Sequence, residues 1–104
     1  MKGRRKFTVV LLPEEGDVYS VVCPALPGCV SQGDGLEGAL VNIQEAIDGI
    51  LKLRRDKGLP LPTETPDIVA DEIRALLHER ADEGLPLRLE THEVEIDVEV
   101  EVPA

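Results

Sequence analysis

The sequence predicts an α+β domain of the order β-β-β-α-(α)-β, with an antiparallel sheet and a helix packed on one of its faces. Apolar, partly β-branched runs near both ends predict strands, and three- and four-residue apolar spacing across residues 36–51 predicts a helix. Glycine and proline separate these stretches. The 104 residues, 42% of them hydrophobic, suffice for a single domain spanning residues 1–104 and are too few for two ordinary ones.

The first third of the chain predicts three short strands joined as an antiparallel meander. The runs are "KFTVVLL" at 6–12, "VYSVVC" at 18–23 and "CVSQ" at 29–32. The stretch "PEEGDV" supplies the first turn and "PALPG" the second, because both combine residues that favour turns.

Two helices are predicted after the meander. The first has a charged outer face; Asp34 is its best N-cap candidate and Gly58 its stop. Thr65 followed by Pro66 predicts the start of a second, shorter helix, which ends at Gly84.

The C-terminal stretch "HEVEIDVEVEV", residues 92–102, alternates strictly and predicts a strand with one apolar and one solvated acidic face. Because a small sheet must cover or pair its edge strands, we expect this strand to form a homodimer or tetramer. The expected oligomer interface is its apolar row: Val94, Ile96, Val98, Val100 and Val102.

One internal repeat affects the domain organisation. The segment "RRDKGLPLPTET" at 54–65 recurs as "RADEGLPLRLET" at 80–91, an offset of 26 positions. This recurrence predicts that residues 66–91 are an inserted unit made of a helix and its exit. The alternative is chance recurrence of residues that end helices.

Composition restricts the class of partner. The formal charge of −10 and the presence of only one Phe and one Tyr argue against direct binding of nucleic acid. An acidic surface favours a basic protein as partner. No stretch has the length of a membrane span, and the short run "FTVVLL" does not fit a signal peptide, so we expect a cytoplasmic protein.

No constellation for catalysis or cofactor binding stands out. Cys23 and Cys29 are expected to be two small apolar side chains, with a disulfide between them as the alternative and no zinc site. The glycines lack the spacing of a phosphate-binding loop. A metal-dependent hydrolase would have to use acidic residues that match no complete cluster: Asp17, Asp34 and Asp48. The prediction is a binding protein without cofactor, not an enzyme.

Residues 7–62 resemble the HicB-like antitoxin domain, in which a "Y-V-V" hairpin precedes the pattern P-x-L-P-G-C-x-x-x-G-D-T-x-E-E-A-x-x-N-x-x-E-A-I. The chain departs from this pattern at Gly35, where Thr or Ser is usual, and at Gly38, where Glu is usual. The matching residues are Pro24, Leu26, Pro27, Gly28, Cys29, Gly33, Asp34, Glu37, Ala39, Asn42, Glu45, Ala46 and Ile47.

The resemblance implies a degenerate ribonuclease H-like arrangement without nuclease activity. It also implies an antitoxin that neutralises a HicA-type toxin, a small basic ribonuclease that cleaves messenger RNA, by covering its catalytic histidine. Many members of the family also carry a C-terminal DNA-binding segment that represses their own operon, whereas this sequence ends in an acidic strand, which argues against autorepression by this chain alone.

The partner-binding surface is expected around a stiff, apolar loop on an otherwise acidic protein, because rigid apolar anchors contribute most to binding. The second hypothesis is an orphan scaffold of this family that forms homo-oligomers and has no toxin partner. The residues expected at the partner surface are Tyr19, Pro24, Leu26 and Pro27.

Overall fold

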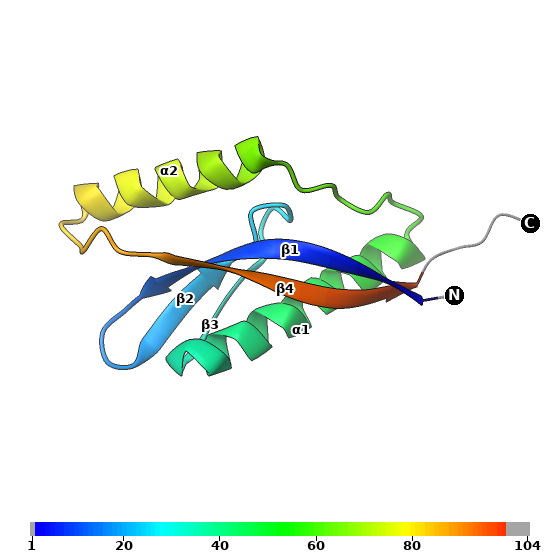
Figure 1. Ribbon diagram of the computed structural model, residues 1–104, viewed down its shortest axis with the longest axis horizontal. Coiled ribbons are helices and arrows are strands. Elements are labelled where there is room, and N and C mark those ends of the chain that lie inside the picture. Colours follow the sequence, from blue (N-terminus) through cyan, green and yellow to red (C-terminus); the bar gives the residue numbers. More distant parts are fainter. Residues whose placement is uncertain (1, 100–104) are drawn as a thin grey trace, which may run out of the picture.

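A four-stranded antiparallel sheet forms the centre of the computed structural model, which describes residues 2–99 (Figure 1). The strand order is β3-β2-β1-β4, so β3 and β4 are the edge strands. The predicted α+β fold, with a meander followed by helices and a final strand, is confirmed. The strands are β1 (Lys2–Pro13), β2 (Val18–Val22), β3 (Val30–Asp34) and β4 (Glu90–Glu99).

Strand β1 begins four residues earlier than predicted because it pairs with β4 along almost its whole length. The register runs from Lys2 opposite Glu99 to Leu11 opposite Glu90. The basic start of β1 therefore lies beside acidic residues of β4. Arg4 lies 3.2 Å from Glu95 and 3.4 Å from Asp97, so opposite charges support a pairing that apolar content alone did not predict.

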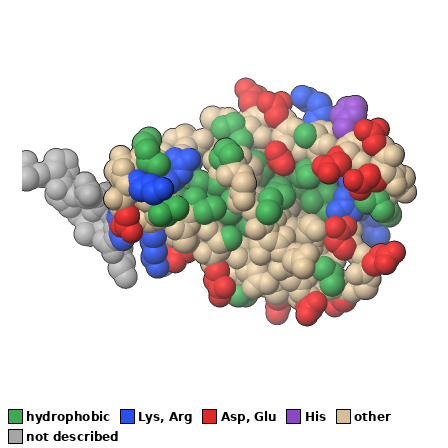
Figure 2. Space-filling model, turned by 180° about the vertical axis from the view of Figure 1, so that it is seen from behind, with side chains coloured by type: hydrophobic (Ala, Val, Ile, Leu, Met, Phe, Trp, Pro, Cys, Tyr) green, Lys and Arg blue, Asp and Glu red, His purple; other side chains and the backbone are tan. Residues whose placement is uncertain are grey.

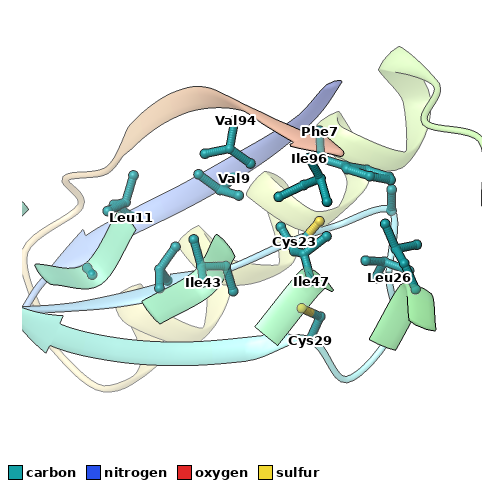
Figure 3. Close-up of a cluster of buried hydrophobic side chains, with 14 residues drawn as sticks. Phe7, Val9, Leu11, Cys23, Leu26, Cys29, Ile43, Ile47, Val94 and Ile96 are labelled. Carbon is teal, nitrogen blue, oxygen red and sulfur yellow. The ribbon is translucent and has the colours of Figure 1, made fainter. Parts of the chain in front are cut away.

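Helix α1 (Gly35–Asp56) packs on one face of the sheet and completes the main core (Figure 3). Its buried side chains recur every four residues, as an amphipathic helix requires. They meet alternate residues of β1 together with Val94 and Ile96 of β4. The buried helix residues are Ala39, Ile43, Ile47 and Leu51.

The junction between β3 and α1 requires a glycine. A Cβ atom on Gly33 would lie 2.5 Å from both the main-chain nitrogen of Ala39 and the carbonyl carbon of Gly38. The strand end and the first turn of the helix are therefore in direct backbone contact. Asp34 occupies the N-cap position as predicted, without a side-chain cap hydrogen bond.

Helix α2 (Pro66–Asp82) lies on the opposite side of the sheet from α1 (Figure 1). Thr65 caps it as predicted, since its hydroxyl accepts from the main-chain nitrogen of Ile68 at 3.3 Å. On this second face Val10 and Leu12 of β1 are buried and lie outside the α1-side cluster. The sheet therefore has two covered faces where one was predicted, although no residue of α2 is itself buried.

The two copies of the repeat fold alike where their helices end. Gly58 and Gly84 have φ of 70° and 69°, and Leu59 and Leu85 donate to the carbonyls of Arg54 and Arg80 at 2.8 and 2.9 Å. The copies then diverge, because the first continues into α2 and the second into β4. That residues 66–91 are an inserted unit remains a prediction. Neither described helix has the length and apolarity to span a membrane.

Candidate partner-binding surface

The loop between β2 and β3 is a compact turn closed by its own backbone. Cys23 donates to the carbonyl of Cys29 at 3.0 Å, and Leu26 donates back to that of Cys23 at 3.0 Å. Tyr19 and Pro24 are half-buried, whereas Pro27 is exposed.

Leu26 corrects one of the site predictions. Its side chain is only 1% exposed and packs in the core on the α1 side, because the loop folds back over that core (Figure 3). A side chain already covered by its own chain cannot serve as an exposed anchor for a partner. The flanking prolines predicted a stiff loop, but they do not indicate whether the side chain of Leu26 points to solvent or into the core.

The two cysteines of this loop are free and buried, as expected for small apolar residues. Burial raises the pKa of both thiols, that of Cys23 to about 12, with a further rise for Cys23 from the neighbouring Cys29. Both groups are therefore uncharged in the core at neutral pH.

The predicted oligomer interface on β4 also needs correction. Val94 and Ile96 are each 5% exposed and pack within the core of their own chain, and Val98 is half-buried against the same core. Val100 and Val102 lie outside the described residues. The described residues of the row thus pack toward α1, because this face of β4 forms one side of the core. The part of β4 that a second chain could pair with is its outer backbone edge, because β4 is an edge strand.

Of the three acidic residues considered for metal chemistry, Asp17 and Asp34 are neighbours, because Val18 pairs with Asp34 and Gly35 donates to the carbonyl of Asp17, whereas Asp48 lies apart from them. Asp17 lies in the first turn and Asp34 at the end of β3, whereas Asp48 lies in the second half of α1 and pairs with Lys52 at 2.9 Å. Within residues 2–99 no three His, Cys, Asp or Glu side chains form a cluster that could hold a metal ion.

Two polar contacts hold α2 against the sheet. Just before the helix, both carboxylate oxygens of Glu64 accept from Thr8, one from its main-chain nitrogen at 2.6 Å and one from its hydroxyl at 2.7 Å. Near the end of the helix, Arg80 pairs with Glu14 at 2.7 Å and donates to the carbonyl of Pro13 at 3.3 Å. Polar contacts therefore attach α2 to the sheet at both ends of the helix.

Beside the contact of Arg80 with Glu14, apolar surface stays accessible near the β3 edge. A groove of about 350 Å³ runs between the end of α2 and strands β1 to β3. Val30 of β3 is 63% exposed there, and Leu85 of the helix exit is 40% exposed. This surface is not apparent from the sequence, because its residues come from four separated segments that only the tertiary fold brings together.

Charge is distributed unevenly over the molecule. Eight of the eleven basic residues lie in two short stretches, 2–6 and 52–57. Figure 2 shows a group of Lys and Arg at the end next to the grey residues, whereas Asp and Glu outnumber the few Lys and Arg toward the other end, where apolar side chains also reach the surface. The acidic end is therefore the more suitable surface for a basic partner.

The family profile described as "HicB_like antitoxin of bacterial toxin-antitoxin system" matches residues 7–79. The chain belongs to the HicB-like antitoxin family. The match includes the second half of β1, all of β2, β3 and α1, and most of α2, so these elements of the HicB-like chain are recognisable from sequence alone.

Two curated relatives of this HicB-like chain are shorter proteins, and the chain covers most of each. A UPF0150 protein of Thermoplasma acidophilum is 36% identical over 62 residues, covering 60% of this chain and 90% of the relative. A UPF0150 protein of Synechocystis is 37% identical over 71 residues, covering 68% and 87%.

Solved structures support the fold. The crystal structure of the N-terminal domain of the Burkholderia pseudomallei antitoxin HicB matches 94% of this chain and all of that one, with a TM-score of 0.56 and 24% identity. The longer HicB structure from the same organism gives a TM-score of 0.60 at 22% identity, with 94% of this chain and 73% of that one covered. The HicB-like assignment and the observed fold therefore agree.

Proposed function

We propose that this chain is a non-enzymatic antitoxin that binds and neutralises a small basic HicA-type ribonuclease in the cytoplasm. Membership of the HicB-like family carries this proposal. The net charge of −10 supports it, because an acidic surface accelerates association with a basic protein and favours the complex.

The test is inhibition of a HicA-type protein encoded beside this chain. We expect messenger RNA cleavage by that protein to stop when the chain is added in equimolar amount, and the inhibition to weaken as salt screens the charges. An unrelated globular protein of equal negative charge serves as the control for non-specific attraction. Undiminished cleavage in the presence of excess chain would contradict the proposal.

A homo-oligomer without a toxin partner is the second candidate, and the open edge of β4 favours it. This edge strand is ten residues long and presents its outer backbone groups to solvent. Repulsion between the acidic rows of two copies is reduced where Arg4 and Lys6 pair with Glu95, at 3.2 and 4.0 Å. Sedimentation velocity across a salt series is expected to show a dimer or tetramer that tightens with salt, and a monomer throughout would contradict it.

A further inference from the structure

The groove beside α2 has an apolar floor. Leu12 of β1 is buried at its base, Val22 and Leu76 line it half-buried, and Val30 and Leu85 are open to solvent. Two of its apolar residues thus remain exposed although the neighbouring residues of the same face are covered. Exposed apolar side chains that adjoin a half-covered floor are typical of an interaction surface.

The rim of the groove is acidic. Glu14, Glu79 and Glu83 line it and are exposed. The one basic lining residue, Arg80, is only 11% exposed and pairs with Glu14 at 2.7 Å, so the net negative charge of the rim comes from Glu79 and Glu83. An apolar floor with carboxylates around it selects a partner segment that carries apolar residues flanked by Lys or Arg.

The adjacent backbone favours side-chain contacts over strand addition. β3 is an edge strand, but Asn42 of α1 donates to the main-chain carbonyl of Gln32 at 2.7 Å. Part of the β3 backbone is therefore already satisfied, which disfavours a partner strand at this edge. An amphipathic helix needs no backbone partner and presents its apolar residues at positions i, i+3, i+4 and i+7.

We propose that this groove binds a basic amphipathic helix of the partner protein, with its apolar face on Val30, Leu76 and Leu85. The proposal rests on the proposed function for the class of partner, a small basic protein. A second copy of this chain is a poorer occupant, because α2 carries five acidic and only two basic residues and would meet an acidic rim.

A synthetic helical peptide tests the groove without a known partner. The probe is a 14-residue peptide with Leu at i, i+3, i+4 and i+7 and Lys elsewhere, compared with a scrambled peptide of the same composition. We expect the amphipathic peptide to perturb the NMR signals of Val22, Val30, Leu76 and Leu85, and the scrambled peptide to leave them unchanged.

Two exposed valines provide a matched pair of variants. Val30→Lys places a positive charge in the groove, whereas Val41→Lys makes the same change at a 52% exposed position on α1. We expect Val30→Lys to weaken peptide binding about tenfold or more and Val41→Lys to leave it within about twofold. Cooperative thermal unfolding of both variants confirms that they fold.

The outcomes separate the groove from the proposed function. Equal effects of the two variants on peptide binding, or NMR signal changes confined to the α1 side, would show that the groove is not the binding site. Loss of a dimer in Val30→Lys alone would also contradict the proposal, because it would assign the groove to contact with a second copy of this chain. If a HicA-type protein binds both variants equally, the groove is not its binding site, but the proposed antitoxin function is not contradicted. If the peptide binds in the groove but the HicA-type protein does not bind the chain, the groove is supported as a binding site and the antitoxin function is contradicted.

Discussion

The two faces of the sheet differ in how they are covered. On one face α1 buries four of its own side chains against alternate residues of β1 and β4. On the other, α2 contributes no buried residue and is held by Glu64 and Arg80 at its two ends. The first face thus supplies most of the core, and the second retains accessible apolar surface. A binding surface can exist on the second face because its cover is incomplete.

Replacing equivalent isoleucines should give the largest contrast between the faces. Ile47→Ala removes a fully buried side chain on the α1 side, and we expect a loss of about 2–5 kcal/mol in the free energy of unfolding. Ile73→Ala on the half-buried side of α2 should cost about 1 kcal/mol, because less apolar surface leaves water there. Urea denaturation measures both, and equal losses would contradict the contrast.

High pH should weaken the α1 face through its buried thiols. Burial raises the pKa of Cys23 from 9.0 to about 12, so between these values the unfolded chain releases a proton that the folded chain keeps. Stability that is complete below pH 9 should therefore decline by about 2–3 kcal/mol by pH 11. Cys23→Ala serves as the control, and an unchanged pH slope in this variant would show that other groups cause the decline.

The close approach of β3 and α1 allows a third comparison. Gly33→Ala should cost about 1–3 kcal/mol, because its Cβ would press on the helix backbone. Gly49 lies within α1, where an added Cβ would meet no atom within 4 Å, so Gly49→Ala should instead stabilise the chain by about 0.5–1 kcal/mol. Thermal unfolding distinguishes them, and a neutral Gly33→Ala would mean that the junction relaxes.

A smaller effect is expected at the polar contact on the second face. A double-mutant cycle of Arg80→Ala and Glu14→Ala should give a coupling of about 1 kcal/mol, since Arg80 is mostly covered and Glu14 is more exposed. Lys52 and Asp48, an exposed pair within α1, should show less coupling in the same assay. A larger coupling for the α1 pair would contradict the role assigned to Arg80.

Local signals in the sequence predicted most of the elements. Apolar periodicity located α1, and Thr65 with Pro66 located the start of α2, because caps and periodicity are local properties. The second covered face was missed, since the run containing Val10 and Leu12 is apolar on both sides and does not say what covers either side. A continuous apolar run indicates a strand buried on two faces.

The candidate site was less predictable. A stiff, apolar loop on an acidic protein predicts Leu26 at the partner surface, yet Leu26 packs in the core. The apolar row that begins at Val94 predicts contact with a second chain, yet Val94 and Ile96 pack toward α1. Alternation shows which residues share a face but not which partner that face meets. The groove combines Val30, Leu76 and Leu85 from separate segments, and only the folded sheet brings them together.

Native-state hydrogen exchange tests the difference between the two faces most directly. The amides of Ile43 and Ile47 in α1 should exchange only through global unfolding, whereas those of Ile73 and Leu77 in α2 should exchange about 100-fold faster or more, through local opening of a layer without buried residues. Equal protection of the two helices, with the same dependence on denaturant, would show that α2 belongs to the same cooperative unit and would contradict the account.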